Sequence, residues 1–304
     1  MKNYVITLAL ITLLGSCNSQ EKNEVIPLAV KETNFNYEPT VLAQDTTKLF
    51  IGEGDINSDT VLIIAEGGPH NQLYFDFSGR TVWSALPDFF SYYRAHIHQA
   101  NTLNPTIYHW KNEFTEEMAE LEVNNEVEIL NRTIKYFKDR NKKVIVAGTS
   151  WGAMMIPYHL TTSGNQADKY LISAGRLDPA PLQVKYHLKG YNSKYLEDGK
   201  TLIFPDTTRV RNPNRGEYYH KISRVKQFMK GALGKHKFTE ELADMDLSNV
   251  IFAYATNDPQ IGALTENEIK FLKSKGVPIY TSDGGHAGPD RRIIELVKDG
   301  TIKL

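Results

Sequence analysis

The sequence predicts an α/β fold in which helices cover both faces of a mostly parallel sheet. Short apolar runs, such as residues 60–66 and 144–147, alternate with longer segments of helical periodicity. Runs that are apolar along their whole length are typical of parallel strands buried on both sides. The 304 residues, 41% hydrophobic and 23% charged, suffice for one such domain, and the net charge of -1 gives no sign of nucleic-acid binding.

The chain begins like an exported protein. A basic start precedes an apolar run at residues 4–14, which is too short for a permanent membrane helix of about 20 residues. The following Leu-Gly-Ser-Cys resembles the lipobox of bacterial lipoproteins. The resemblance implies a signal peptide of residues 1–16, lipid on Cys17, and a lipid anchor in the bacterial outer membrane, on its periplasmic or surface face. A plain secretion signal is the alternative, and residues 17–46 are expected to be a polar tether and N-terminal segment.

Residues 47–304 are expected to hold the folded domain. The strands are expected at residues 60–66, 106–109, 144–147, 170–174, 250–256 and 278–281, and the helices at residues 115–140, 151–162, 266–275 and 291–298. Glu116 and Glu117 give the first helix the acidic start that its dipole favours, and Pro157 kinks or limits the second. We interpret the aromatic run at residues 89–93 as a packed helix.

Residues 179–248 interrupt the alternation of strands and helices. An excursion of this length is too long for an ordinary connection, so an inserted cap is predicted. The segment carries 13 Lys and Arg against 8 Asp and Glu. Its arginines and a tyrosine pair could contact an anionic or carbohydrate-like substrate, although a solvated basic face is the favoured interpretation. These residues are Arg209, Arg211, Arg215, Arg224, Tyr218 and Tyr219.

Ser150 is the candidate nucleophile. It lies in Gly148-Thr149-Ser150-Trp151-Gly152, which follows a predicted strand and precedes a predicted helix. The Gly-x-Ser-x-Gly pattern requires this context, because a sharp turn strains the serine backbone and projects its hydroxyl above the sheet edge. Side chains two residues away on either side would collide, so glycine is expected there. An ordinary strand-to-helix turn is the alternative.

His286 is the candidate base, because a serine hydroxyl needs a base to take its proton. It follows the last predicted strand in a glycine-rich loop, downstream of Ser150 and beyond the insertion. His159 follows Ser150 too closely, on the same predicted helix, to face back onto it. The other downstream histidines, His187, His220 and His236, lie in the insertion.

Asp258 is the candidate acid that would orient the imidazole. It follows the end of a predicted strand within Asn-Asp-Pro, and α/β sheets place their sites at the carboxyl ends of strands. The chain order Ser150, Asp258, His286 also suits such a triad. The alternative for Asp258 is a turn-forming residue before proline. Asp178 is the runner-up acid, and Asp283 lies too near His286 in the sequence to be preferred.

Two backbone N–H groups are expected to stabilise the oxyanion of an acyl-transfer reaction. One belongs to Trp151, directly after the nucleophile. The other is assigned to Gly68, with Gly67 as an alternative, in the Glu-Gly-Gly-Pro-His loop after the first predicted strand. A plain Gly-Gly-Pro turn would explain the same residues without a function.

These motifs together resemble the α/β-hydrolase superfamily over about residues 47–304. The resemblance implies the hydrolase fold and the Ser-Asp-His triad. Gly-Gly-Pro and Ser-Trp-Gly are similar to the prolyl iminopeptidase branch, which usually has His before Gly-Gly-Pro and Gly after it. Those positions hold Glu66 and His70 here, so the fold and the triad carry over but no substrate does.

Three functions follow from these patterns. The first is a serine esterase that acts on a small-molecule ester or on a short peptide or glycan ester. The second is an aminopeptidase-like amidase, which needs a carboxylate in the insertion for the substrate ammonium; the glutamates there are Glu197, Glu217, Glu240 and Glu241. The third is a non-catalytic binding lipoprotein. No cofactor is expected, and His96, His98 and His109 lack the companions of a metal site.

Overall fold

The fold is described from a computed structural model, which defines residues 37–70, 73, 81–108, 114–204 and 217–304. Contacts divide the chain into residues 1–33 and residues 34–304, and every described residue belongs to the second unit. The predicted signal peptide and the predicted lipidation site Cys17 lie outside the described residues.

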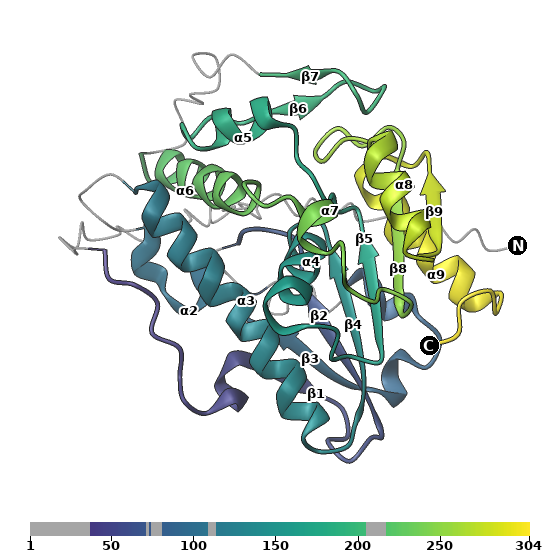
Figure 1. The fold of residues 1–304 in the computed structure, drawn as a ribbon. Coiled ribbons are helices and arrows are strands. Elements are labelled where there is room, and N and C mark those ends of the chain that lie inside the picture. Colours follow the sequence, from purple (N-terminus) through teal and green to yellow (C-terminus); the bar gives the residue numbers. More distant parts are fainter. Residues whose placement is uncertain (1–36, 71–72, 74–80, 109–113, 205–216) are drawn as a thin grey trace, which may run out of the picture. The chain divides into compact units, whose positions relative to one another are not determined.

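A seven-stranded sheet forms the centre of the described domain (Figure 1). In sheet order its strands are β1 (Phe50–Glu53), β3 (Tyr93–Ile97), β2 (Thr60–Ala65), β4 (Lys143–Thr149), β5 (Lys169–Ser173), β8 (Val250–Ala255) and β9 (Ile279–Ser282). Only the edge strand β1 runs antiparallel to its neighbour, and the other pairs are parallel. The predicted mostly parallel sheet is therefore confirmed, and its parallel strands end on a common edge.

Successive strand residues face two separate cores. Val61 of β2 packs in a core with α3 (Glu116–Lys138) and α4 (Trp151–Ser163), whereas Leu62 packs in a second core with α9 (Gly288–Lys298). Both faces are thus apolar and covered, which explains why the strands are apolar along their whole length.

The amphipathic helices begin at residues that satisfy their first N–H groups. The Thr115 side chain accepts a hydrogen bond from the Met118 N–H at the start of α3. Thr265 and Glu268 form a reciprocal capping box at the start of α8 (Glu266–Ser274). Such caps stabilise a helix by about 1 kcal/mol each. The structure confirms the four predicted helices and five of the six predicted strands, with ends that differ by up to three positions.

The predicted strand at residues 106–109 is wrong. Residues Pro105–Tyr108 form a 3-10 helix, whose start is held by the Asn104 side chain accepting from the Thr106 N–H at 3.1 Å. The strand in this part of the sheet is β3. Arg94 and His96 of β3 interrupt the apolar pattern, although both are buried. The strand could therefore not be predicted from the spacing of apolar residues.

The aromatic run at residues 89–93 is only partly helical. A single 3-10 turn covers Phe89–Ser91, and Tyr93 already belongs to β3. The Arg94 guanidinium explains why the chain turns here, because it donates to the carbonyl oxygens of Phe89, Phe90 and Tyr92. The predicted packed helix is therefore corrected to a short turn that leads into a strand.

Residues 179–248 contribute five elements between β5 and β8. They are α5 (Pro181–His187), β6 (Lys194–Tyr195), β7 (Leu202–Ile203), α6 (Glu217–Leu233) and α7 (Phe238–Glu241). β6 and β7 pair antiparallel, and α6 packs against α3 and α5. In Figure 1 α5, β6 and β7 lie beyond the end of the sheet at which β5, β8 and β9 finish.

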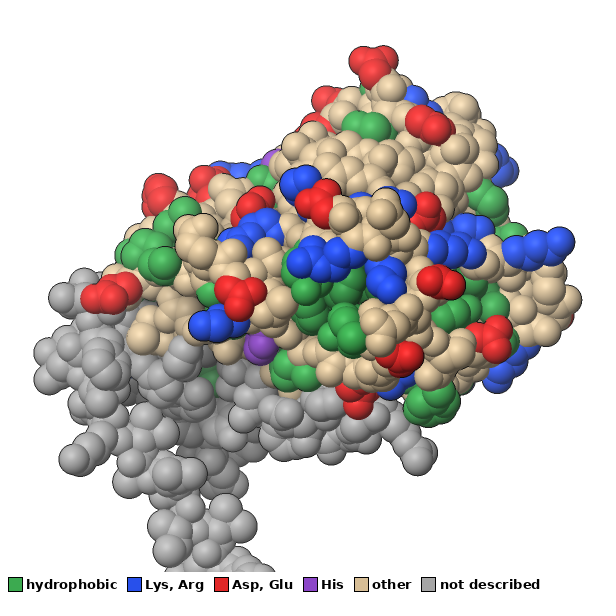
Figure 2. Space-filling model, turned by 90° about the horizontal axis from the view of Figure 1, so that it is seen from below, with side chains coloured by type: hydrophobic (Ala, Val, Ile, Leu, Met, Phe, Trp, Pro, Cys, Tyr) green, Lys and Arg blue, Asp and Glu red, His purple; other side chains and the backbone are tan. Residues whose placement is uncertain are grey.

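Figure 2 shows the molecule from below, the side away from α5, β6 and β7. On this face lysine, arginine, aspartate and glutamate side chains are interspersed. Among the described helices, none combines the length and the apolar character of a membrane-crossing segment.

Candidate active site

Ser150 lies on a strained turn between β4 and α4. Its backbone angles, φ 53° and ψ -108°, are unfavourable for a residue with a side chain, and such strain persists only where the surrounding structure enforces it. Here the Ser150 N–H donates to the Ser173 carbonyl of the neighbouring strand at 2.9 Å. The turn therefore has the conformation that the sequence motif predicts.

The flanking glycines are required by contacts with the backbone. A Cβ on Gly152 would lie 2.0 Å from the Ala65 carbonyl oxygen, and a Cβ on Gly148 would lie 2.7 Å from the Gly152 carbonyl oxygen. Neither obstacle is a flexible side chain, so any larger residue would force β2, β4 and α4 apart. The Gly152 N–H in turn donates to the Glu66 carbonyl at 3.1 Å, which ties the helix start to the loop after β2.

His286 and Asp258 form a hydrogen-bonded pair. His286 Nδ1 lies 2.7 Å from Asp258 Oδ2, and the other carboxylate oxygen accepts from the Gln260 N–H at 2.7 Å and the Ile261 N–H at 3.1 Å. Asp258 is 1% exposed. A buried carboxylate with these donors holds the proton on Nδ1 and leaves Nε2 available as a base.

Asn257 fixes the loop that carries His286. Its side-chain oxygen accepts from the Gly285 N–H at 3.0 Å, and its amide nitrogen donates to the Asp283 carbonyl at 2.6 Å. Asn257 was not among the site residues predicted from the sequence. Its position beside Asp258, at the end of a strand, was the available signal.

Ser150 follows β4 and His286 follows β9, so both lie beyond the carboxyl edge of the sheet, with β5 and β8 between their strands. Among the described residues, the Ser150 hydroxyl makes no hydrogen bond with His286; such bonds are often long in unliganded sites. Asp290 connects the two neighbourhoods, since its carboxylate accepts from the Thr149 hydroxyl at 2.9 Å. Burial raises the pKa of Asp290, and the hydrogen bond from Thr149 and the nearby charge of His286 oppose that rise.

The loop after β2 lies beside Ser150, the candidate nucleophile. A Cβ on Gly67 would lie 3.5 Å from the Ser150 Cβ, and Gly68 lines a pocket together with Ser150 and Trp151. The two glycines that were considered for the oxyanion donor are thus both beside Ser150.

Gln99 holds this loop in place and was missed in the sequence. Its Oε1 accepts from the His70 N–H at 2.7 Å, while its Nε2 donates to the carbonyl oxygens of Gly67 at 3.0 Å and Glu66 at 3.3 Å. Because Gln99 follows β3, which the sequence pattern did not reveal, no local signal pointed to it.

A buried glutamate lies beneath Trp151. Glu126 Oε2 accepts from the Trp151 indole N–H at 2.5 Å, and Oε1 accepts from the Ala100 N–H at 3.2 Å. Burial raises the pKa of Glu126 to about 8, against the opposing effect of these two hydrogen bonds. Glu126 thereby links α3 to Trp151, the residue that follows Ser150.

The residues considered as alternatives to Asp258 and His286 are hydrogen-bonded elsewhere. Asp178 accepts from the Thr239 N–H and hydroxyl at 3.2 and 2.5 Å. His159 is buried between Asn131 and Tyr170. No cluster of metal-ligating side chains occurs in the ranges that the structure defines, and His109 lies outside them.

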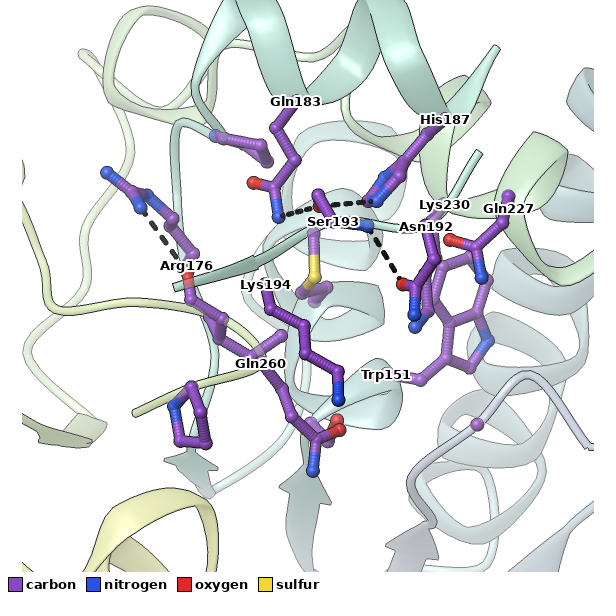
Figure 3. Close-up of a pocket in the computed structure, with 16 residues that line it drawn as sticks. Trp151, Arg176, Gln183, His187, Asn192, Ser193, Lys194, Gln227, Lys230 and Gln260 are labelled. Atoms are coloured by element: carbon purple, nitrogen blue, oxygen red, sulfur yellow. Dashed lines mark hydrogen bonds between the residues drawn. The ribbon is translucent and has the colours of Figure 1, made fainter. Parts of the chain in front are cut away.

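The pocket beside Ser150 has a volume of about 320 Å³ (Figure 3). Figure 3 shows Gln183 and His187 of α5 at the top of the view, with Trp151 and Gln260 below them. A hydrogen-bonded chain runs along one wall, in which Ser193 Oγ contacts Gln183 and His187 at 3.0 and 2.9 Å. Arg209, Arg211, Arg215 and the side chains of Tyr218 and Tyr219 lie outside the described parts, and Arg224 is placed over the Phe228 ring.

Comparisons with known proteins agree with this architecture. No protein-family model matches the chain, and no curated protein matches it. Among solved structures, MGS-M2, an alpha/beta hydrolase enzyme from a Medee basin deep-sea metagenome library, aligns with a TM-score of 0.50 at 14% identity, covering 84% of this chain and 94% of that one. A protein described as a non-heme bromoperoxidase, BpoC from Mycobacterium tuberculosis H37Rv, aligns with a TM-score of 0.51 at 10% identity, covering 88% and 96%. The sheet order, the strained turn after β4 and these alignments together show that this chain has the α/β-hydrolase fold.

Proposed function

We propose that this protein is a serine hydrolase that cleaves an ester through Ser150, Asp258 and His286. The observation that supports it most is the hydrogen bond between His286 and Asp258. These residues follow β9 and β8 at the sheet edge where Ser150 follows β4. A strained serine, a buried carboxylate and a partly exposed imidazole at one edge are the parts that acyl transfer needs.

The proposed reaction has two steps. In the first, His286 takes the Ser150 proton while the serine oxygen bonds to the acyl carbon; the ester C–O bond then breaks, and the leaving alcohol receives that proton. In the second, a water molecule attacks the acyl-enzyme with His286 again as base, which releases the acid and restores the serine. The backbone N–H groups of Trp151 and Gly68 would stabilise the oxyanion formed in each step.

Labelling with a fluorophosphonate tests this proposal. The wild-type protein should be modified at Ser150, located by mass spectrometry, and should hydrolyse 4-nitrophenyl butyrate. Ser150→Ala should lose both properties, whereas Ser274→Ala, a change at an exposed position on α8, should retain both. Absence of labelling and of hydrolysis in a folded wild-type protein would favour the binding lipoprotein instead.

The aminopeptidase-like alternative has less support. A substrate ammonium needs a carboxylate, yet the described residues that line the pocket include no Asp or Glu. The carboxylate of Glu241 is already bonded to His236 and to the Lys237 N–H. Release of 4-nitroaniline from prolyl or other aminoacyl anilides would reverse this preference.

We further infer that the folded domain is tethered to the cell envelope through lipid on Cys17. The lipobox-like Leu-Gly-Ser-Cys supports this inference. Labelled palmitate should be incorporated by the wild-type protein but not by Cys17→Ser, and the envelope fraction should lose the variant. Retention of the variant in the membrane fraction would point to another means of attachment.

A further inference from the structure

The pocket beside Ser150 is strongly cationic. Arg176, Lys194 and Lys230 line it, whereas its described lining includes no carboxylate. Arg176 is neutralised locally, since its Nε lies 3.5 Å from the buried carboxylate of Glu268. The positive charge available to a ligand therefore comes from the two lysines.

Lys230 is the more informative of these lysines. It projects from α6 into the pocket, and in the part of the chain that the structure describes its ammonium has no hydrogen-bond or ion-pair partner. Lys226 lies one helical turn away and adds a like charge. Desolvating an ammonium without a counter-ion is costly, so such a group favours an anion that enters the pocket.

An unpaired acceptor lies on the same helix. Gln227 is 6% exposed, lines the pocket, and its Oε1 has no hydrogen-bond partner among the described atoms. An unsatisfied buried amide oxygen costs about 1–3 kcal/mol, which a ligand hydroxyl or N–H would recover. The pocket thus offers an anion site and an acceptor within the cavity that reaches Ser150.

We propose that the substrate is an ester that carries an anionic group, which binds to Lys230, with Lys194 at the exposed side of the pocket adding to the attraction. This inference rests on the proposed esterase function, since it names the substrate class of the same site. An anionic substrate also explains why the described pocket lining has no carboxylate. The same lining would repel the ammonium of an aminopeptidase substrate.

Matched esters test the proposal. Mono-4-nitrophenyl adipate carries a carboxylate on its acyl part, and its methyl ester is the neutral counterpart. The pair 4-acetoxybenzoate and methyl 4-acetoxybenzoate places the charge on the alcohol part. For at least one pair, the wild-type kcat/KM should favour the anionic member, and Lys230→Met should lower that preference about 30-fold, as expected for loss of one partner of a desolvated charge pair.

The matched control is Lys185→Met, a change on the exposed side of α5 that should keep the wild-type preference. Lys230→Met should also raise the Tm of the ligand-free protein, because it removes a half-buried ammonium that has no counter-ion among the described residues, and this readout separates the expected effect from misfolding. Equal rates on both members of each pair, or an unchanged preference in Lys230→Met, would overturn the proposal.

A binding measurement separates this proposal from the esterase assignment. If no ester is cleaved, the esterase function fails, and calorimetry with monomethyl adipate still decides whether the anion site exists. The wild-type protein should bind this probe, and Lys230→Met should not. Absence of binding to the wild-type protein would refute the anion site.

The pH dependence of binding gives a third readout. Burial, with a contribution from Lys226, lowers the pKa of Lys230 to about 8. His187 on α5 and His70 in the loop after β2 also face this region, and burial and the lysine charges lower their pKa values to about 3 and about 4, so both are neutral. The Kd for monomethyl adipate, measured on Ser150→Ala so that the probe is not hydrolysed, should therefore rise as the pH increases above about 8, where Lys230 loses its charge. Burial also lowers the pKa of Lys226, whereas Arg176 is paired with Glu268 and Lys194 lies at the exposed side of the pocket.

Discussion

Replacing Asp258 by asparagine gives the sharpest test of the candidate triad. Asp258 Oδ1 accepts two backbone N–H groups, so an asparagine would keep its carbonyl oxygen on that side and turn its NH2 toward His286 Nδ1. The imidazole would then carry its proton on Nε2 and could not accept the Ser150 proton. The loss of kcat should be about 10⁴-fold, which corresponds to about 5 kcal/mol of transition-state stabilisation.

The assay is kcat on 4-nitrophenyl butyrate, measured beside the free energy of unfolding. Because Asn keeps the two backbone hydrogen bonds, unfolding should change by no more than about 1 kcal/mol. Asp178→Asn is the matched control: it weakens only the contacts with Thr239 and should leave kcat unchanged while lowering stability by about 1 kcal/mol. If Asp258→Asn kept a tenth of the wild-type kcat, or if Asp178→Asn lowered kcat about 10⁴-fold, then Asp258 would not be the residue that orients His286.

Three further predictions concern the residues around Ser150. Gln99→Leu removes three hydrogen bonds from the loop that carries Gly67; we expect kcat to fall about 100-fold with little change in KM, and a normal kcat would show that the loop plays no part in the oxyanion hole. Gly152→Ala places a methyl group 2.0 Å from the Ala65 carbonyl oxygen; denaturant unfolding should show a loss of about 3 kcal/mol, and wild-type stability would contradict the packing of β2 against α4. The folded-state pKa of Glu126 is about 8 against an ordinary value of 4.5, so its contribution to stability is complete below about pH 4.5 and is lost as the pH rises through about 8. Glu126→Gln should flatten that part of the stability profile in chemical denaturation between pH 4 and 9, and an identical slope in both proteins would mean that Glu126 is ionised throughout.

The strained turn at Ser150 could be derived from the sequence because its causes are local. The strand before Ser150, the helix after it and the two glycines all lie within a few residues, and the same backbone crowding that explains the glycines is seen in the structure. The Asp258–His286 pair was predictable for a related reason. Both residues follow apolar strands, and parallel strands in one sheet bring their carboxyl ends to one edge.

Contacts between distant segments decided what the sequence left open. β3 escaped prediction because the burial of Arg94 and His96 depends on the β1, β2 and Phe89 neighbours that surround them, not on a period of apolar residues. Gln99 in turn became recognisable as a loop support only after β3 was placed.

The amino-acid sequence by itself determined the class of fold, the strained turn at Ser150 and the order of the candidate triad, since each depends on patterns within short segments. Only the tertiary structure decided that the alternative Asp178 is bonded to Thr239, that Gln99 holds the loop after β2, and that Lys230 lacks a counter-charge among the described residues. The physical reason is that pairing and desolvation are properties of neighbours in space. In the sequence, nothing distinguishes Lys230 from the other lysines of α6. It becomes a candidate anion site only because the folded chain forms a pocket around it.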